Sequence, residues 1–465
     1  MNSEFPYPGL RPYKRTESDI FFGRTEHVLT LLEKLEKGLH FVAVSGTSGS
    51  GKSSVIRAGL LASLNLAPTG KYWRKVVMRP GNAPFTNLAK AFLKDDKSPD
   101  QGDLALRKEY VRHYNLNVDS AREHLEKILR ISTKSLHKIL SNVLPDNHNL
   151  LIVVDQFEEL FRHTQDELEV ELFIDWLLAS CEHPDTYVAI TLRSEFIDRE
   201  CAQYPSLHQA IMDHLFSIPC LPPESLPEII EGPAGIFASQ VKDDLKTQLL
   251  EDVQKLEFDH RADQLPLLQY ALYRLWQEAS EGKPDEARIT LTLQQYQNIG
   301  GLKALAHEVE KAYQSVKPAH RKAVEIIFRR LSRCDEEGQY VRQVATLESL
   351  AELTGKNWAS IPEVINDFRY RGFLTPPYES NLDSPINLID IPHESIIRQW
   401  ERLKSWANVE KEWVYFCERL QERAQSESNK KGELLHGLDL ENALAWLNNL
   451  KELYETEGQQ KAWAR

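Results

Sequence analysis

The stretch FVAVSGTSGSGKSS, residues 41–54, decides the fold of this chain. Residues 41–45 are a short apolar run rich in β-branched side chains, which predicts a buried strand. Residues 46–53 match G-x-x-x-x-G-K-[ST], the phosphate-binding P-loop, whose glycines let backbone N–H groups turn inward around phosphate oxygens. A helix predicted from Ser53 to Leu61 favours an anion at its N-terminus. The stretch therefore predicts a strand, loop and helix that bind the phosphates of a nucleotide.

The loop residues have distinct expected roles toward that nucleotide. Lys52 would place a positive charge on the β- and γ-phosphates, and Ser53 would offer its hydroxyl to Mg²⁺. The alternative is a Gly/Ser-rich loop without a ligand, but the strand before it and the helix after it favour the P-loop interpretation. The residues predicted to contact the nucleotide are Gly46, Thr47, Ser48, Gly49, Ser50, Gly51, Lys52, Ser53 and Ser54.

The composition is that of an ordinary globular protein, with 42% hydrophobic and 27% charged residues. The length of 465 residues suits about three domains. A formal net charge of −13 disfavours broad attraction to nucleic acid or anionic lipid. No apolar run approaches the roughly 18 residues of a transmembrane helix, and the N-terminus lacks the layout of a signal peptide. Because the five cysteines form neither a zinc spacing nor a disulfide framework, we predict a cytoplasmic protein without a membrane partner.

A second motif follows the continuous apolar run at residues 150–154, which ends in Asp155. Such runs form central strands of parallel sheets, and ligands bind at the carboxyl ends of those strands. This is the Walker B pattern, so Asp155 is predicted to hold Mg²⁺ directly or through water. Glu158 and Glu159 are both candidates to polarise the attacking water, and nothing in the sequence chooses between them. Their alternative role is favourable charge in the first turn of a helix.

Two further strands are predicted around these motifs. Residues 76–81 form a strand that ends in a turn, and residues 187–193 form a buried strand with Arg193 at its end. Arg193 would reach the γ-phosphate and report hydrolysis; the alternative is a salt-bridging arginine. The P-loop, the acid-ended strand and the arginine-ended strand stand in the order that an AAA-like P-loop NTPase requires. The predicted fold class is therefore α/β, with a parallel-sheet core and with Lys52 and Arg193 among its catalytic residues.

Two features precede the P-loop. Residues 6–13, PYPGLRPY, are too proline-rich for a helix and are predicted to form an extended arm. The segment FFGR, residues 21–24, opens an amphipathic helix that runs to about Leu39. Its two aromatic rings, glycine and arginine suit one wall of a base pocket, and they equally suit a hydrophobic helix start with a surface arginine. The residues by themselves leave both interpretations open.

The order of eight motifs resembles the STAND class of P-loop NTPases, signal-transducing switches that include the NACHT and NB-ARC proteins. Within it, the resemblance is to the bacterial novel STAND NTPase family. The motifs are PYPGLRPY (6–13), FFGR (21–24), GTSGSGKSS (46–54), RPG (79–81), VVDQFEELF (153–161), TLRSEF (191–196), LPLLQYAL (265–272) and IPHESIIRQW (391–400). By this resemblance Phe22, Gly23 and Arg24 border the adenine of ATP or ADP. Pro266 stands where a lid proline packs on the base, and His393 stands where a histidine contacts the β-phosphate of ADP.

One position departs from the wider AAA-type pattern. Those ATPases carry Glu directly after the Walker B Asp, whereas this chain has Gln156. The DQFEE form is typical of the novel STAND group; it leaves the catalytic glutamate open and is compatible with slow hydrolysis. No guanine-reading N-K-x-D motif is visible, so adenine is favoured by resemblance.

Four parts are predicted along the chain. Residues 1–217 form the NTPase core, residues 218–318 a helical lid, residues 319–405 a winged helix, and residues 406–465 a helical tail. Prolines clustered between positions 219 and 233 mark the first boundary. The winged helix is predicted from its order of elements: a helix, a second helix (Leu347–Leu353), a third helix (Ile361–Gly372), strands at 373–375 and 386–391, and a helix from Glu394.

The winged helix raises nucleic acid as a competing partner, because such domains often place their third helix in a major groove. Arg369, Tyr370 and Arg371 on that helix keep this idea open. Glu363 and Asp367 on the same helix oppose it, as does the acidic chain. In STAND proteins, which this chain resembles, the domain is a lever on the nucleotide.

Three functions compete. The first is a switch that binds ATP or ADP with Mg²⁺, hydrolyses slowly, and oligomerises or recruits a partner when ATP-bound, in bacterial defence or signalling. The second is a steadily cycling AAA-type ATPase acting on nucleic acid, which a lid arginine sensor such as Arg261 or Arg274 would favour. The third is a scaffold with a structural nucleotide. The resemblance implies that sensor and effector domains lie outside this chain.

Overall fold

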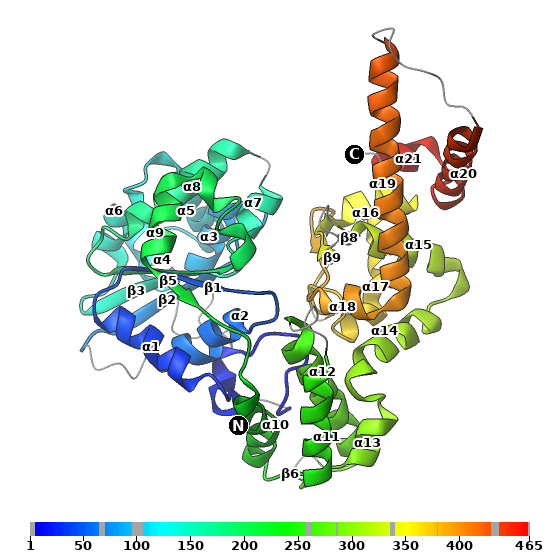
Figure 1. Ribbon diagram of the computed structural model, residues 1–465. Helices are drawn as coiled ribbons and strands as arrows, with labels where there is room; N and C mark the ends of the chain where they lie inside the picture. The colour runs from blue at the N-terminus through cyan, green and yellow to red at the C-terminus, as the bar shows by residue number, and fades with distance from the viewer. Residues whose placement is uncertain are drawn as a thin grey trace. The chain divides into compact units, whose positions relative to one another are not determined.

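The computed structural model describes residues 5–64, 70–94, 106–164, 166–256, 262–284, 287–334, 340–378, 380–428 and 437–463. Contacts between residues divide the chain into two compact units (Figure 1). The first unit comprises Met1–Pro8 and Pro12–Gln295, and the second comprises Gly9–Arg11 and Tyr296–Arg465. The P-loop and the Walker B motif therefore belong to the first unit, and His393 belongs to the second.

The first unit is built on a five-stranded sheet with strand order β2-β3-β4-β1-β5. All its pairings are parallel. Its strands are β1 (Phe41–Gly46), β2 (Tyr72–Met78), β3 (His148–Val154), β4 (Thr186–Arg193) and β5 (Leu215–Ser217). The register sets Gly46 beside Arg193, and Asp155 follows β3 directly. The predicted α/β core is thus confirmed, and its motif-bearing strand ends share one edge of the sheet.

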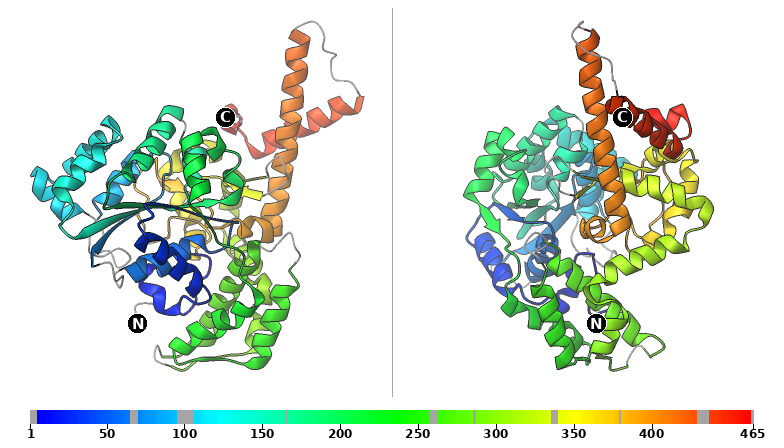
Figure 2. Two further views of the ribbon diagram at one scale, coloured as in Figure 1. Left: turned by 60° about the vertical axis from the view of Figure 1, so that its left-hand side comes forward. Right: turned by 45° about the vertical axis from the view of Figure 1, so that its right-hand side comes forward.

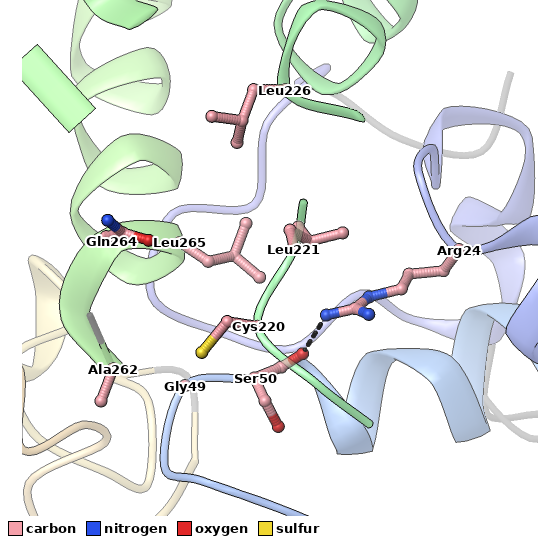
Figure 3. A pocket seen from close by; sticks show the side chains of 9 residues that line it. All are labelled: Arg24, Gly49, Ser50, Cys220, Leu221, Leu226, Ala262, Gln264 and Leu265. Carbon is pink, nitrogen blue, oxygen red and sulfur yellow. Dashed lines mark hydrogen bonds between the residues drawn. The ribbon is translucent and has the colours of Figure 1, made fainter. Parts of the chain in front are cut away.

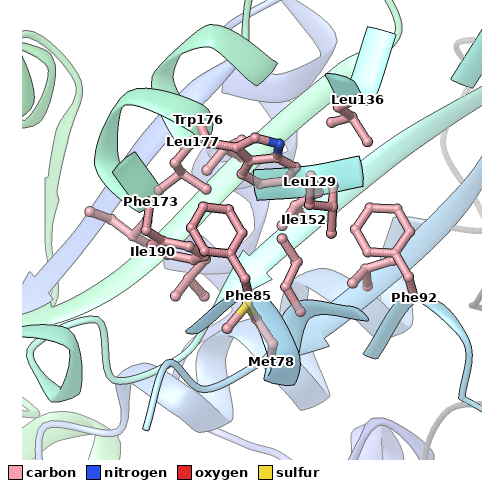
Figure 4. Close-up of a cluster of buried hydrophobic side chains, with 14 of the residues drawn as sticks. Met78, Phe85, Phe92, Leu129, Leu136, Ile152, Phe173, Trp176, Leu177 and Ile190 are labelled. Atoms are coloured by element: carbon pink, nitrogen blue, oxygen red, sulfur yellow. The ribbon is translucent and has the colours of Figure 1, made fainter. Parts of the chain in front are cut away.

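Strand side chains alternate between two buried faces, which explains the continuous apolar runs of the sequence. On one face Ile152 and Ile190 pack with the aromatic side chains of α3 and α8 (Figure 4). On the other face Val42 and Val44 pack against α1 and the helix after the P-loop. In Figure 2 the blue helices of the first 64 residues lie on one side of the sheet and the cyan to green helices on the other. The helices of this core are α1 (Thr25–Glu36), α3 (Pro84–Phe92), α4 (Arg107–Tyr114), α5 (Val118–Ile131), α6 (Ser135–Val143), α7 (Glu159–His163), α8 (Glu167–Ser180) and α9 (Pro205–Asp213).

The helix predicted from Ser53 to Leu61 exists, but only its first turn is α-helical. α2 covers Lys52–Ser54, and Val55–Leu61 continue as a π-helix. Within this wider stretch, a Cβ on Gly59 would come within 2.3 Å of Val28 Cγ2, so α1 packs directly on its backbone. Wide helical turns of this kind are frequent at functional sites.

The second predicted strand is displaced toward the N-terminus. β2 begins at Tyr72 and ends at Met78, instead of running from residue 76 to residue 81. Pro80 explains the early end, because proline has no N–H to donate to a strand ladder. Arg79 consequently lies just beyond the sheet edge, next to the end of β3.

The lid elements of the first unit follow β5. They are α10 (Leu226–Ile236), β6 (Gln240–Val241), α11 (Asp243–Gln254), α12 (Gln264–Ser280), β7 (Thr290–Leu291) and α13 (Leu293–Asn298). The small parallel pair of β6 and β7 was not predicted. The stripe of Leu268, Leu272 and Leu275 on α12 is buried, as its helical spacing predicts. The first unit ends at Gln295, inside the predicted lid, so the boundary at residue 318 stays a prediction.

The second unit shows the helix order expected for residues 319–405. Its elements are α14 (Ala304–Ser315), α15 (Pro318–Arg330), β8 (Ser332–Cys334), β9 (Tyr340–Arg342), β10 (Ala345–Thr346), α16 (Leu347–Thr354), α17 (Ile361–Tyr370), β11 (Leu388–Ile389), α18 (Ser395–Gln399), α19 (Glu401–Ser428), α20 (Gly437–Leu453) and α21 (Glu457–Trp463). β11 pairs with β10, within the range predicted as a strand. The strand predicted at residues 373–375 is wrong, because only a single bridge from Thr375 to Asp390 forms there. Pro376 and Pro377 follow and supply no N–H groups for a longer ladder.

The described part of the segment after residue 405 is mostly helical, as predicted, and residues 454–456 separate α20 from α21. α19 packs against α15, and Trp413 joins Ile326 and Tyr454 in a shared apolar cluster. Across the described residues, no helix has both the length and the apolar character needed to cross a membrane.

Candidate nucleotide site

The P-loop leaves β1 as a tight backbone cradle. Gly49 and Gly51 adopt left-handed backbone conformations, with φ of 79° and 91°, which side chains other than glycine rarely tolerate. A Cβ on Gly46 would lie 2.6 Å from the carbonyl oxygen of Ile218 and 2.7 Å from Ser50 Oγ. The Ser50 hydroxyl is buried and has no hydrogen-bond partner. A cradle that admits only glycine, with an unsatisfied donor beside it, fits the phosphates of a nucleotide.

Lys52 folds back over this cradle. Its Nζ donates to the carbonyl oxygens of Gly46 and Thr47, each at 2.7 Å. Burial lowers the pKa of Lys52 to about 8, while the nearby Glu158 carboxylate opposes that shift. The ammonium group therefore stands at the loop itself, where the phosphates of a nucleotide would lie.

Asp155 and Ser53 meet at the end of β3. Ser53 Oγ donates to Asp155 Oδ1 at 2.7 Å, and Thr191 Oγ1 donates to the same oxygen at 2.8 Å. A hydroxyl and a carboxylate are oxygen ligands of the type that Mg²⁺ prefers. Within the described part of the chain, no three His, Cys, Asp or Glu side chains gather as a metal site. An ion held by Ser53 and Asp155 would therefore take its other ligands from the nucleotide and water.

Two arginines that the sequence analysis did not assign also contact Asp155. Arg57 Nη2 donates to Oδ2 at 2.9 Å, and Arg79 Nε lies 3.9 Å from the same oxygen. Burial alone would raise the pKa of Asp155, but these arginines and the two hydroxyls outweigh it and hold the pKa at about 2. A signal for Arg57 was present, because it stands four residues after Ser53 and hence on the same side of the helix.

Glu158 and Arg193 form a buried pair at the same edge of the sheet. Arg193 Nε lies 3.4 Å from Glu158 Oε1, and both side chains are at least nine-tenths buried. The second carboxylate oxygen, Glu158 Oε2, is buried and has no hydrogen-bond partner among the residues that the structure describes. Because its charge also raises the pKa of Lys52, Glu158 belongs to the surroundings of the P-loop.

Glu159 faces a different part of the unit. It is the first residue of α7, and its Oε2 accepts from the backbone N–H of Gly81 at 3.3 Å. The divergence of the two glutamates begins at Gln156, which has a left-handed φ of 59°. Its backbone N–H donates to Thr191 Oγ1 at 2.8 Å, which fixes this turn. The structure thus separates two neighbours that the sequence alone could not distinguish.

A pocket lies between the P-loop and the lid (Figure 3). Its lining residues are Arg24, Gly49, Ser50, Cys220, Leu221, Leu226, Ala262, Gln264 and Leu265. The mostly apolar lining beside the phosphate cradle suits a nucleotide base. Leu221, Leu226 and Leu265 were missed, because only the fold brings the segment after β5 to α12.

Arg24 ties the pocket wall to the P-loop. Its Nη2 donates to the carbonyl oxygens of Ser50 at 2.9 Å and Pro219 at 2.8 Å. Burial lowers the pKa of Arg24 to about 10, and the nearby Cys220 opposes this shift. Arg24 is therefore no surface arginine, and its place supports the base-pocket interpretation of the segment FFGR.

Phe22, Gly23 and Pro266 stand near the pocket without lining it. A Cβ on Gly232 of α10 would lie 2.9 Å from the Phe22 ring, and one on Gly23 would lie 2.8 Å from Ile229 Cδ1. Phe22 and Gly23 thus pack against α10. Pro266 is buried within α12, next to the lining residue Leu265.

Other predicted residues occupy separate places. Ser54 Oγ accepts from the backbone N–H of Tyr13 at 3.2 Å, which fastens the N-terminal arm to the P-loop helix. Arg274 donates to Gln277 along α12 at 2.6 Å, and Arg261 lies outside the described residues. His393 lies in the second unit, where its Nδ1 accepts from the backbone N–H of Ser395 at 3.1 Å.

Comparison with known proteins gives one family. Residues 6–433 match the family model described as Novel STAND NTPase 1. No curated protein matches the chain.

Solved structures give a weaker likeness. The Aeropyrum pernix ORC1 protein in complex with DNA has 16% sequence identity and a TM-score of 0.42, over 83% of this chain and 95% of that chain. The Aeropyrum pernix ORC2 protein in its ADPNP–ADP complexes has 14% identity and a TM-score of 0.44, over 83% and 94%. Drosophila ORC bound to DNA has 12% identity and a TM-score of 0.37, over 81% and 86%. Likeness at this level carries no functional argument.

Proposed function

The chain belongs to the novel STAND NTPase 1 family, and from this premise we propose that it is a nucleotide-operated molecular switch. It binds ATP or ADP with Mg²⁺, hydrolyses ATP slowly, and signals through the conformational difference between the two states. The observation that carries the proposal is the convergence of Lys52, Asp155 and Glu158 at the carboxyl end of one parallel sheet. This is the place where open α/β sheets bind their ligands.

Each group at this edge has a proposed task in hydrolysis. The cradle of residues 46–51 and the Lys52 ammonium hold the phosphates, and Ser53 and Asp155 hold Mg²⁺. Mg²⁺ held by these residues would supply positive charge that neutralises the phosphates. Glu158 orients the attacking water through its unpartnered Oε2, and its partner Arg193 contacts the γ-phosphate.

Glu158 is the better candidate for the base than Glu159. A general base must lie within hydrogen-bond reach of the water that it activates. Glu158 acts on the Lys52 ammonium electrostatically, whereas Glu159 is engaged with the backbone N–H of Gly81. The ion pair between Arg193 and Glu158 engages one carboxylate oxygen of the proposed base, which agrees with slow turnover.

The base of the nucleotide is proposed to lie in the pocket beside the P-loop. Leu221 and Leu265 would contact its faces, and Arg24 would close the end of the pocket near Ser50. Phe22, Gly23 and Pro266 support this wall from behind, through α10 and α12. The pocket has no charged acceptor for a guanine amino group among its lining residues, which agrees with adenine.

His393 is proposed to report ADP to the second unit. The Nδ1 atom of His393 contacts the backbone N–H and the hydroxyl of Ser395, so the proposal assigns the phosphate contact to Nε2. An Nε2–H group can donate to a β-phosphate oxygen. Such a bond would stabilise a closed ADP state, and exchange for ATP would release it. Oligomerisation or recruitment of a partner protein would follow.

The competing function, an ATPase acting on nucleic acid, is not favoured by the second unit. Arg369 on α17 is buried and donates to the carbonyl oxygens of Pro376, Pro377 and Ser380. Arg371 pairs with Asp367 and Glu308. Both basic side chains of this helix therefore already serve protein partners, instead of presenting free charge to phosphates.

Sedimentation velocity separates the two functions. The switch predicts a larger assembly with a non-hydrolysable ATP analogue than with ADP, and an assembled His393→Ala variant even with ADP. His320→Ala, on α15 of the same unit, is the matched control and should behave as the wild type. Steady ATP turnover that rises with DNA, without any change in assembly, would contradict the switch.

A further inference from the structure

Both oxygens of the Asp155 carboxylate already have protein partners. Oδ1 accepts from Ser53 at 2.7 Å and from Thr191 at 2.8 Å. Oδ2 accepts from Arg57 at 2.9 Å and lies 3.9 Å from Arg79 Nε. The single negative charge of Asp155 therefore lies between two guanidinium groups, in the position where a Walker B carboxylate would meet a divalent cation.

Of the two arginines beside Asp155, Arg57 makes the hydrogen bond, whereas Arg79, which is 40% exposed, lies 3.9 Å away. Asp155 is 1% exposed, whereas the Arg57 side chain is 31% exposed. Arg57 also stands in the π-helical stretch that continues the P-loop helix. Its Nε is buried without a hydrogen-bond partner, so the contact with Asp155 is made by the outer guanidinium nitrogen alone. A long, partly exposed side chain can carry its charge into water at low cost.

We propose that Arg57 is a resident counter-cation that competes with Mg²⁺ for Asp155. The inference rests on the proposed function, because it concerns the same nucleotide site. While Arg57 occupies Oδ2, the carboxylate is neutralised without a divalent ion, and the site holds ADP with little dependence on Mg²⁺. A divalent cation that reaches Asp155 meets a positive charge already in place and displaces it. ATP favours that displacement more than ADP does, because its γ-phosphate supplies a further oxygen ligand.

The test is the Mg²⁺ dependence of ADP affinity, measured by calorimetry on the full chain after removal of bound nucleotide. For the wild type, the Kd values in EDTA and in Mg²⁺ should agree within about threefold. For Arg57→Ala, ADP should bind about tenfold more tightly in Mg²⁺ than in EDTA, since the competing charge is gone. Arg130→Ala is the matched control, because Arg130 also pairs with carboxylates, Glu126 and Glu169, away from the site. It should behave as the wild type.

A second experiment measures the binding of a divalent cation directly. Electron paramagnetic resonance of Mn²⁺, titrated with ADP present, should show about tenfold tighter ion binding by Arg57→Ala than by the wild type. Arg57→Gln removes the same charge with less loss of volume and carries the same test if the alanine variant does not fold.

The outcomes separate the inference from the proposed function. Equal Mg²⁺ dependence in the wild type and in Arg57→Ala, with ADP binding intact, would overturn the inference and leave the switch standing. A wild-type chain that binds ADP under neither condition would overturn the switch, and the inference with it.

Discussion

Two regions of the molecule bury charged side chains, and they satisfy them differently. At the sheet edge of the first unit, Glu158 Oε2 and Arg24 Nε are buried and find no hydrogen-bond partner within the described part of the chain. On α17 of the second unit, Arg369 is just as buried, but three backbone carbonyls of the loop that follows accept its hydrogen bonds. Both regions were candidate binding surfaces from the sequence.

The difference teaches how to tell a ligand site from a structural tie. A buried polar atom without a partner costs stability, so a fold retains it where a ligand completes the site. A buried arginine that is satisfied by carbonyls holds a loop in place and has little left for a partner. We therefore expect the sheet edge of the first unit to bind the ligand, whereas Arg369 on α17 holds the loop that follows this helix.

The largest expected effect is on the P-loop lysine. Lys52→Ala should weaken ADP binding about 1,000-fold, because it removes the charge that the cradle directs at the phosphates. Lys71→Ala is the matched control: Lys71 forms an exposed pair with Asp185 at the opposite edge of the sheet. Calorimetry with ADP measures both. Equal affinity in Lys52→Ala and the wild type would remove the sheet edge as the binding region.

The next effect belongs to the second region. Arg369→Ala should lower the free energy of unfolding by about 3 kcal/mol, since three carbonyl groups lose their donor. Arg371 is itself 36% exposed, and its buried partner Glu308 keeps a second ion pair with Lys311, so Arg371→Ala should cost under about 1 kcal/mol. Urea denaturation followed by tryptophan fluorescence measures both, and ADP affinity should not change in either. Similar decreases in the free energy of unfolding for the two variants would contradict the difference that we expect between the buried Arg369 and the more exposed Arg371.

A pair of glutamate variants sharpens the comparison within the first unit. Glu158→Gln should slow ATP hydrolysis about 100-fold, as expected when a general base is lost. Glu159→Gln should leave the rate within about threefold of the wild type, because its carboxylate binds the Gly81 backbone instead. Single-turnover hydrolysis measures both rates. The opposite ranking would reassign the base to Glu159.

The smallest effect is a pH dependence that belongs to Lys52. Burial lowers the pKa of Lys52 to about 8, and a bound phosphate would raise it by favouring the charged form. Above pH 8 the free protein has lost a proton that the complex keeps, so ADP affinity should fall as pH rises, by about tenfold per pH unit. Calorimetry across this range measures the slope. Lys52→Arg, whose side chain stays charged, should show a flat profile, and a flat profile in the wild type would refute the assignment.

The parallel sheet, and the position of the candidate site at the carboxyl ends of its strands, were predictable from the sequence. Parallel strands bury both faces, so their continuous apolar runs stand out, and each run ends at the same edge. The sequence alone therefore predicted that Asp155 and Arg193 lie beside the P-loop. A position for Arg57 beside these residues could also have been predicted, because Arg57 stands four residues after Ser53 on the same helix.

The rest depended on features that no local pattern carries. The choice between Glu158 and Glu159 depends on the left-handed turn at Gln156, a conformation that glutamine seldom adopts. The base pocket depends on Leu221 and Leu265, which are ordinary apolar residues until the fold brings them together. The strand predicted at residues 373–375 was wrong, because the prediction gave more weight to the apolar character of these residues than to the two prolines that follow them.

The most direct test of the account is the nucleotide content of the purified chain. The protein would be denatured, and the released nucleotide identified and quantified by chromatography, with Lys52→Ala prepared in parallel. If the chain is a switch that ADP holds closed, the wild type should carry close to one ADP per chain. The Lys52→Ala variant should carry none. A wild-type protein that is purified without nucleotide and hydrolyses ATP rapidly would contradict the account, because such a site would release the ADP that a switch must retain.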